Sequence, residues 1–226
     1  MNRYLRAILR NPHEFLASGV HKRSSFFVKR YVYRGATTLL KTSIRRAPAQ
    51  NAFERGLQLE AAKLPTPTPV AIGHRRTAGI LFESVLVTQR ISDVTELRAW
   101  RRNSLSMARS AAELVARLQS HGFLHRDLSL TNLVADAAGQ IQIVDLDTMR
   151  QAELTEQHRM KELERFLRTS LLQRPVSRAH RLQFLIHYCR LQDEQDWKRW
   201  WRSVDVLYSA ESARRALKAG RGEHDT

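Results

Sequence analysis

One stretch of the sequence, from His121 to Met149, constrains this chain more than any other. It contains the triplet His125-Arg126-Asp127, and Asn132 follows the aspartate by five residues. Asp145 stands eighteen residues after Asp127, at the end of a short apolar run. Two carboxylates and an amide at this spacing supply oxygen atoms that can accept a proton and bind a divalent cation.

A β-hairpin is predicted inside this stretch. Leu133–Ala135 are apolar, as are Ile141, Ile143 and Val144, and the polar turn of residues 136–139 separates the two runs. This pattern is typical of two short antiparallel strands. The hairpin would carry Asn132 at one end and Asp145 at the other, on the same side, so that both face one space.

The spacing of these residues resembles that of a kinase catalytic loop and its metal-binding aspartate. In phosphoryl transfer, one carboxylate accepts the proton of the acceptor hydroxyl, while an amide and a second carboxylate hold magnesium against the ATP phosphates. We therefore expect Asp127 to be the catalytic base, and Asn132 and Asp145 to bind Mg2+. The role of Asp147 is open between a third carboxylate of the metal site and a solvent-facing or capping residue.

His125 is expected to pack beneath the catalytic loop rather than to bind a metal. His121 precedes it by four residues, a spacing that could form a metal pair on a helix. Gly122 and the turn-forming composition around it break any helix there, so the packing role is preferred.

A strand rich in aromatic and β-branched residues is predicted at residues 25–33, and it contains Lys29. A lysine on a strand far before the catalytic aspartate can neutralise the α- and β-phosphates of ATP. Lys29 is therefore the expected phosphate-binding residue, with Lys41 as the alternative. If Lys29 has no function in binding, it would be an edge-strand lysine that faces solvent. No glycine-rich loop precedes it, so the cover over the phosphates should be shorter or looser than usual.

A helical region is expected from Lys41 to Glu60, and it should supply a carboxylate that holds Lys29 in place. Glu54 and Glu60 are six residues apart, so they point to different faces and only one can serve. We choose Glu54 for this role.

The segment between this helix and the catalytic stretch predicts strands and a hinge. Residues 64–70, with three prolines, should run extended into the next strand. A polar hairpin turn is expected at residues 74–77, followed by two linked strand pieces around Glu83-Ser84. Gln89-Arg90-Ile91 falls where a kinase has its interlobe hinge, so the backbone groups of Gln89 and Ile91 are expected to hold the adenine.

Helices are predicted for most of the remaining chain. Helical spacing occurs at residues 1–18, 93–102, 105–120, 153–172, 178–190 and 194–218. Trp197, Trp200 and Trp201 in the last helix are expected in the core or, beside basic residues, at a membrane interface. Little room remains after Asp147 for the long activation segment that docks a peptide, so we expect a small or sugar-like acceptor.

The charge of the chain indicates an acidic partner, because the net charge is +16 and the pI is near 11.0. The single Cys189 excludes an intrachain disulfide, fits a reducing compartment and is expected to pack in the core. No signal peptide is apparent, and no run of about eighteen apolar residues is present. We expect a cytoplasmic protein, either soluble or peripheral to the membrane.

The motifs resemble those of the bacterial lipopolysaccharide core kinases, the heptose and Kdo kinases that share a protein-kinase-like fold. The resemblance runs through FFVKRY, AFERGLQLEAAKLPTPTPVAIG, ESVLVTQRI, HGFLHRDLSLTNLV, IQIVDLD and RMKELERFLRTS. It implies an α+β fold of two lobes. A small, mainly β N-terminal lobe would cover residues 1–90, and a mainly helical catalytic lobe would cover residues 91–226.

The resemblance also implies a function, which is ATP-dependent phosphorylation of a Kdo or heptose hydroxyl in the lipopolysaccharide inner core. Lys29 would then contact the ATP phosphates, Asp127 the acceptor hydroxyl, and Asn132 and Asp145 the Mg2+ ion. The basic surface would meet the acidic glycolipid and the anionic headgroups of the inner membrane, and no nucleic-acid partner is expected.

Two features depart from the family pattern and motivate other hypotheses. Glu54 follows Phe53, whereas the family usually has a glutamate before an aromatic residue, and Leu146-Asp147 replaces the Phe-Gly of protein kinases. One alternative is a compact protein kinase of the kind that acts in translation or tRNA modification. The other is a pseudokinase scaffold, because the glycine-rich loop is missing and Glu54 is displaced.

Overall fold

The computed structural model describes residues 25–33, 46–97, 105–173 and 176–206, together with Ser209 and Ala213. The described residues form two compact units. Unit 1 consists of the residues up to Ser92 and of Val144–Met149; unit 2 consists of Asp93–Ile143 and the residues from Arg150 onward. Residues 144–149 belong to unit 1, so these two units differ from the two lobes expected at residues 1–90 and 91–226. The division into two lobes remains a prediction.

Several predictions concern residues outside the described ranges. They are the helix at residues 1–18, the alternative lysine Lys41, residues 98–102 of the helix expected at 93–102, and the last helix beyond residue 206. The expected start of the helix at 93–102 is wrong, because Thr95–Glu96 form the short strand β4.

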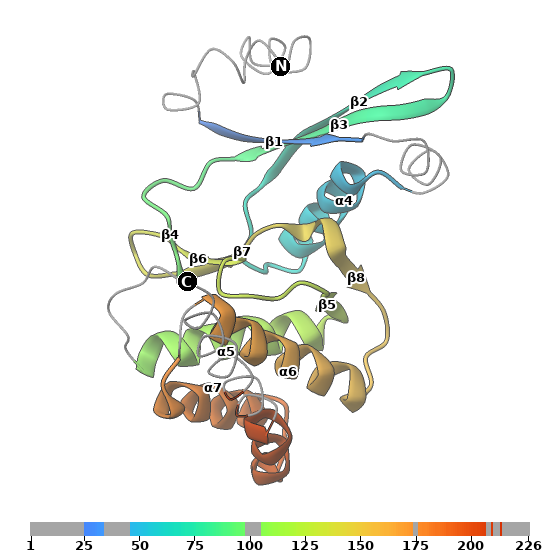
Figure 1. The fold of residues 1–226 in the computed structure, drawn as a ribbon. Helices are drawn as coiled ribbons and strands as arrows, with labels where there is room; N and C mark the ends of the chain where they lie inside the picture. The colour runs from blue at the N-terminus through green and yellow to red at the C-terminus, as the bar shows by residue number, and fades with distance from the viewer. Residues whose placement is uncertain are drawn as a thin grey trace, which may run out of the picture. The chain divides into compact units, whose positions relative to one another are not determined.

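Unit 1 contains an antiparallel sheet in the order β1-β3-β2 (Figure 1). The strands are β1 Phe26–Val32, β2 Pro69–Thr77 and β3 Ile80–Gln89. Ala78 and Gly79 join β2 to β3 with φ angles of 49° and 80°. This pair of positive φ angles suits a tight hairpin. The expected turn at residues 74–77 is therefore wrong: those residues are strand, because Gly79 adopts the left-handed conformation more easily.

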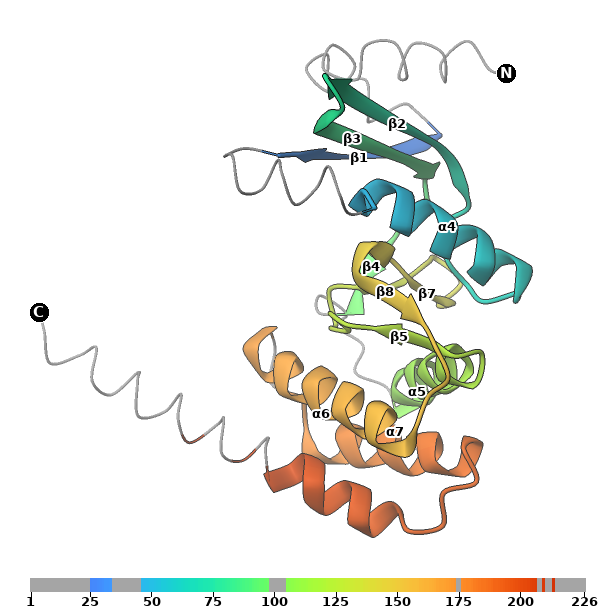
Figure 2. The same cartoon turned by 90° about the vertical axis from the view of Figure 1, so that its right-hand side faces the viewer.

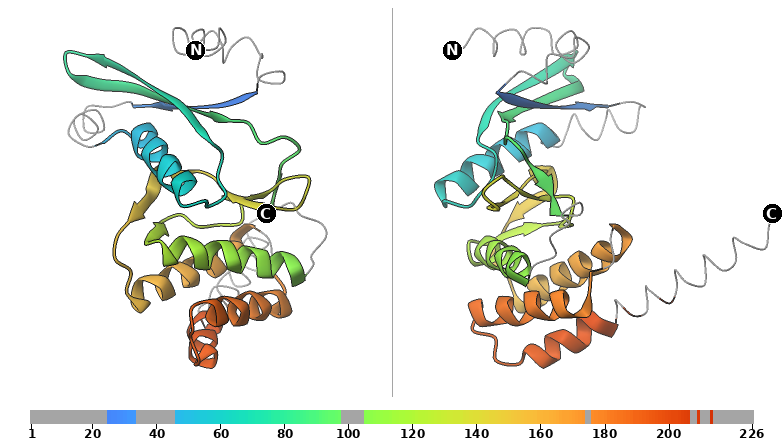
Figure 3. Two further views of the ribbon diagram at one scale, coloured as in Figure 1. Left: turned by 180° about the vertical axis from the view of Figure 1, so that it is seen from behind. Right: turned by 90° about the vertical axis from the view of Figure 1, so that its left-hand side faces the viewer.

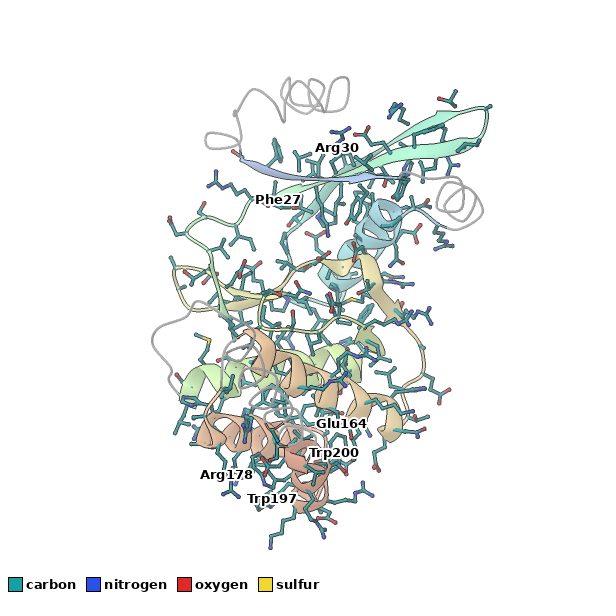
Figure 4. All side chains as sticks on the ribbon, viewed as in Figure 1. Phe27, Arg30, Glu164, Arg178, Trp197 and Trp200 are labelled. Atoms are coloured by element: carbon teal, nitrogen blue, oxygen red, sulfur yellow. The ribbon has the colours of Figure 1, made fainter. Side chains whose placement is uncertain are left out.

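Glu83 lies inside β3 with only 3% of its side chain exposed. The Nη2 atom of Arg30 on β1 donates to its carboxylate at 3.2 Å, and Nε of Arg75 on β2 lies 3.4 Å from it. Arg30 is labelled in Figure 4. Because two guanidinium groups compensate the buried charge, β3 continues through Glu83 and Ser84. The expected interruption of the strand at this point is wrong.

Helix α4 Pro48–Ala61 packs against one face of this sheet (Figure 1). It begins with a proline, whose missing N–H costs nothing in the first turn of a helix. The buried positions Ala49, Ala52, Gly56 and Leu59 recur at helical spacing. A Cβ atom at Gly56 would lie 3.1 Å from the Pro69 ring, so the missing side chain lets the helix approach β2 closely.

Unit 2 is mainly helical. It contains α5 Leu105–Ser120, α6 Glu156–Gln173, α7 Arg178–Leu191 and a helical segment at residues 197–206. Helix α7 lies between α5 and the segment at 197–206 (Figures 2 and 3). The start of α7 is fixed by Ser177, whose hydroxyl accepts a hydrogen bond from the backbone N–H of His180.

Aromatic side chains form the core between these helices. Phe166, Phe184, Tyr188 and Trp200 follow one another with ring-centroid separations of 5.3, 6.4 and 5.7 Å. Trp200 is fully buried, and Cys189 in α7 is also buried, as expected for a core cysteine. Of the tryptophans considered for a membrane interface, Trp200 therefore belongs to the core (Figure 4).

Short strands in unit 2 support the catalytic stretch. They are β4 Thr95–Glu96, β5 Phe123–His125, β6 Leu133–Ala135 and β7 Ile141–Ile143. Strands β6 and β7 pair antiparallel, with Leu133 opposite Ile143, so the predicted hairpin is confirmed. Strand β5 pairs with β8 Met149–Gln151.

Gly122 precedes β5 with φ +77°, and a Cβ atom there would lie 2.7 Å from the carbonyl oxygen of Ala152. We expect Gly122→Ala to destabilise the chain by about 2–4 kcal/mol, since left-handed strain and a backbone clash act together. The matched control is Gly139→Ala. Gly139 has φ +81° but nothing within 4 Å of its Cβ position, so only the strain of about 1 kcal/mol should remain. Urea unfolding measures both, and equal losses would contradict the clash.

Candidate functional site

Lys29 projects from β1 into an acidic environment in unit 1. Its Nζ atom donates to Oδ1 of Asp145 and, at 3.3 Å, to Oδ2 of Asp147. It also lies 4.9 Å from the centre of the Tyr31 ring. Burial lowers the pKa of Lys29, but the hydrogen bonds and charges of the two aspartates outweigh burial and raise the pKa above 10.5. The ammonium therefore stays charged, as phosphate binding requires.

Asp145 adopts a left-handed backbone conformation, with φ 64° and ψ 56°. The short 3-10 helix η3 Leu146–Thr148 follows it directly. Leu146 is buried, so it anchors the turn while the Asp145 side chain remains 36% exposed. This backbone conformation is uncommon outside glycine, asparagine and aspartate, and here it serves to turn the carboxylate toward Lys29.

Asn51 on α4 holds this turn by its backbone. Its side-chain Nδ2 donates to the carbonyl oxygens of Asp147 at 2.7 Å and of Met149 at 3.2 Å. The contact gives α4 a positioning role that sequence reasoning missed. An asparagine inside a helix was the available signal, because asparagine is a poor helix former unless its side chain has a partner.

Asn51→Ala is expected to destabilise the chain by roughly 1–3 kcal/mol, because two carbonyl groups lose their donor. Alanine favours helix formation, so the loss cannot come from α4 itself. The control Gln50→Ala removes a hydrogen bond to Glu54 on the helix surface and should change stability by less than about 0.5 kcal/mol. Thermal unfolding compares the two variants, and equal midpoints would contradict the role of Asn51.

Asp147 is directed toward Lys29 rather than toward solvent, with 19% of its side chain exposed. Burial and the neighbouring Asp145 raise its pKa, while Lys29 and Tyr31 oppose the shift. Burial, with the negative charges of the two aspartates, also raises the pKa of Tyr31, so its phenol stays neutral. The position of Asp147 favours a role in the site over a solvent-facing one.

The expected pair between Lys29 and Glu54 is not formed in this structure. The Glu54 carboxylate accepts hydrogen bonds from Arg46 at 2.6 Å and from Gln50 at 3.0 Å. Glu60, the alternative, accepts from Thr68 Oγ1 at 3.2 Å. Arg46 precedes α4, Gln50 lies on it and Thr68 lies just before β2, whereas the counterions of Lys29 come from the segment after β7. The assignment of Glu54 must be corrected for this state of the chain.

Gln89 and Ile91, the predicted hinge residues, lie near the end of the first segment of unit 1. Gln89 closes β3, and its backbone N–H donates to the carbonyl oxygen of Thr68 at 2.8 Å. That N–H is therefore already used within the sheet. Ile91 is half-buried in the irregular segment after β3. The contact of Gln89 and Ile91 with adenine remains a prediction.

Asp127 and Asn132 belong to the loop that follows β5 in unit 2. Asp127 is exposed, while the next residue, Leu128, is 1% exposed and anchors the loop. Nδ2 of Asn132 donates to the backbone carbonyl of Asp127 at 2.8 Å. Because the amide nitrogen is used in this way, the amide oxygen is the atom of Asn132 that can face a cation.

Helix α6 holds the loop that carries Asp127 through hydrogen bonds to its backbone. His125 is 2% exposed, as expected for a residue packed under the loop, and its backbone N–H donates to Glu162. Arg165 Nη1 donates to the carbonyl oxygen of Arg126 at 2.6 Å. Sequence reasoning placed α6 but missed Glu162 and Arg165, because their spacing alone resembles that of a solvated charged helix face.

Comparison with known proteins gives the family of this chain. The sequence model of the lipopolysaccharide kinase (Kdo/WaaP) family matches residues 10–188. The chain therefore belongs to the lipopolysaccharide kinase (Kdo/WaaP) family, which confirms the resemblance inferred from its motifs.

Similar proteins include two 3-deoxy-D-manno-octulosonic acid kinases of Xylella fastidiosa. One is 27% identical over 116 residues, 50% of this chain and 46% of that protein. The other is 29% identical over 92 residues, 40% of this chain and 36% of that protein. The matches thus span about half or less of the length of these relatives.

Among solved structures, the crystal structure of WbdD is similar, with a TM-score of 0.50 and 14% identity over 82% of this chain and 47% of that chain. At this identity the likeness concerns the fold alone. The mixed α and β composition with small antiparallel sheets agrees with the expected fold class. The two-lobed arrangement remains a prediction.

Proposed function

We propose that this chain is an ATP-dependent kinase that phosphorylates a sugar hydroxyl of the lipopolysaccharide inner core. The observation that carries the proposal is the placement of Lys29 between the carboxylates of Asp145 and Asp147, in a chain of the Kdo/WaaP family. A lysine that stays charged beside an aspartate at the end of a strand pair supports phosphate and metal binding in one place.

The residues present fit magnesium and a nucleotide. Asp145 offers a half-exposed carboxylate and Asn132 an amide oxygen, and such oxygen ligands suit Mg2+. Lys29 carries the positive charge that a triphosphate requires. Bound Mg2+ would neutralise charge on the phosphates, and Asp145 and Asn132 would hold it. Lys29 would exchange its aspartate partners for phosphate oxygens.

Asp127 is the proposed base for the acceptor. Its exposed carboxylate is free to take the hydroxyl proton, while the hydrogen bond from Asn132 fixes the backbone at the same residue. The proposal requires Asp127 and Asn132 to act on the same nucleotide as Lys29 and Asp145. Catalysis would then depend on positioning and on charge neutralisation.

The nature of the acceptor follows from the short segment after the metal aspartate. Between η3 and α6 the chain forms only β8 and a few irregular residues. This segment is too short to dock a peptide, which favours a sugar acceptor over a protein. The Xylella relatives are named as 3-deoxy-D-manno-octulosonic acid kinases, so Kdo is the first acceptor to test and heptose the second.

The location of the proposed acceptor agrees with the charge of the chain. A net charge of +16 favours an acidic glycolipid and an anionic membrane surface. None of the helices in the described ranges is long and apolar enough to cross a bilayer. We propose that the chain acts at the cytoplasmic face of the inner membrane.

The direct test is phosphate transfer from radiolabelled ATP to purified core lipopolysaccharides that end in Kdo or in heptose, with Mg2+ present. We expect label on one acceptor class and a matching mass increase of one phosphate. Transfer to neither class would contradict the proposal. If ATP and Mg2+ also fail to raise the thermal midpoint of the chain, the scaffold hypothesis is favoured.

A further inference from the structure

Glu162 on α6 is a buried carboxylate directly under the loop that carries Asp127. It is 5% exposed, and both of its oxygens accept hydrogen bonds. Oε1 accepts from the backbone N–H of His125, and Oε2 accepts from Nε2 of Gln119 on α5 at 2.6 Å. The carboxylate therefore connects α5 and α6 to the backbone two residues before Asp127.

Arg165, one turn further along α6, holds the adjacent part of the same backbone. Its Nη1 atom donates to the carbonyl oxygen of Arg126 at 2.6 Å. Positions three apart on a helix lie on one face. Glu162 thus accepts from the N–H of His125, and Arg165 donates to the carbonyl oxygen of the next residue, Arg126. Together they fix both polar groups of the backbone just before Asp127.

We propose that Glu162 is a positioning residue that holds the catalytic loop firmly when its carboxylate is ionised and loosens it when protonated. This inference rests on the proposed function, because it assigns Asp127 to catalysis. The chain would then carry a built-in dependence of turnover on pH around neutrality.

The chemistry of the two states differs at the His125 N–H. An ionised carboxylate is an acceptor at both oxygens and makes charge-assisted hydrogen bonds, which are about twice as strong as neutral ones. A proton on Oε2 can be accommodated if the Gln119 amide turns over, so that its Oε1 accepts this proton and its Nε2 donates to the Tyr188 hydroxyl, which now donates to Oε1. The His125 N–H then keeps only a neutral acceptor, and the loop is held less tightly.

Burial makes both states accessible. It raises the pKa of Glu162 to about 7, against the hydrogen bonds from Gln119 and His125 and the charge of Arg165. Among the described residues, Tyr188 on α7 is linked to the carboxylate through Gln119, and burial raises the pKa of Tyr188, so it stays neutral near pH 7. Nearby Arg159 lies 3.6 Å from Glu194, which balances its charge.

The first test is the pH profile of kcat, measured between pH 5.5 and 8.5 with the acceptor found above. Turnover of the natural chain should rise about fivefold from pH 6 to pH 8, the ratio expected when a neutral hydrogen bond becomes charge-assisted. Glu162→Gln is permanently neutral, so its profile should lack this rise and its kcat should stay near the low-pH value.

The matched control is Glu164→Gln, which makes the same change two residues along α6, about 200° around the helix from Glu162; Glu164 is labelled in Figure 4. Its pH profile should follow that of the natural chain. A Glu162→Gln variant that keeps the natural pH dependence would overturn the inference.

A second test does not require activity. Amide hydrogen exchange of residues 123–127 should be about fivefold faster in Glu162→Gln than in the natural chain at pH 8, and unchanged in Glu164→Gln. If the natural chain shows no transfer to any acceptor, the proposed function fails, and hydrogen exchange alone decides whether Glu162 holds the loop. Unchanged exchange would overturn the inference even in an active enzyme.

The pH dependence of folding stability is a third test of whether Glu162 titrates. The folded pKa of about 7 lies above the ordinary value of 4.5, so the folded chain binds this proton more tightly than the unfolded chain. The stability contributed by Glu162 is therefore lost as pH rises from about 4.5 to about 7. The thermal midpoint of Glu162→Gln relative to the natural chain should rise over this range, and a constant difference would show that Glu162 does not titrate there.

Discussion

Replacing Asp127 by asparagine is expected to lower kcat by about 10²–10⁴-fold, the usual contribution of a general base. The KM for ATP should change little, because Asp127 is proposed to act on the acceptor and not on the nucleotide. Asparagine has almost the same shape, and the hydrogen bond from Asn132 goes to the backbone of residue 127, so the loop should be preserved. Steady-state kinetics with the phosphorylated sugar as product measures the effect.

The control for this experiment is Asp193→Asn. Asp193 is exposed and has a φ angle of 55°, which asparagine also tolerates. Its variant should keep full activity. If Asp127→Asn retains more than about a tenth of the natural kcat, Asp127 is not the base, since so small a loss is below the range for proton transfer.

Asp145→Asn should abolish the magnesium dependence of ATP binding and lower kcat by roughly 10²–10³-fold, as for loss of one strong electrostatic contact in a site. The left-handed backbone at this position is well tolerated by asparagine, so the turn should survive. In the natural chain, ATP at a hundred times its dissociation constant should stabilise the fold by about 2.7 kcal/mol. For Asp145→Asn, we expect equal thermal shifts with ATP in Mg2+ and in EDTA.

Asp147→Asn is the comparison that decides the role left open for Asp147. If Asp147 is a third carboxylate of the metal site, its variant should also lose part of the magnesium-dependent shift. If it serves only as a partner of Lys29, the magnesium-dependent shift should be kept. A full magnesium-dependent shift in Asp145→Asn would contradict the assignment of the metal to Asp145.

The local order of the catalytic stretch followed from the sequence alone. The apolar runs on both sides of a polar turn predicted the hairpin that β6 and β7 form. The aromatic and β-branched residues around Lys29 predicted β1, because such side chains pack well on the pleated, half-buried surface of a strand. These features depend on neighbours in the sequence, so a pattern is enough to find them. The family, too, could be inferred from the motifs themselves.

The ion-pair partners of Lys29 could not be predicted from local sequence patterns. Helical position left Glu54 and Glu60 as candidates, but a choice between ion-pair partners depends on distances in space. In the folded chain the partners come from Asp145 and Asp147, more than a hundred residues away in sequence. A glutamate of α4 was expected to position Lys29 directly. In the structure Asn51 of α4 instead binds the backbone carbonyls of the turn that carries the partners of Lys29.

The sequence by itself therefore determined which chemical groups are available and the short elements that carry them: the lysine on its strand, the aspartate loop and the hairpin. Only the tertiary structure decided which of these groups are paired, which carboxylates are buried and which backbone groups hold the loop. The physical reason is that periodicity is a property of consecutive residues, whereas ion pairing, desolvation and buried hydrogen bonds arise between segments that only folding brings together.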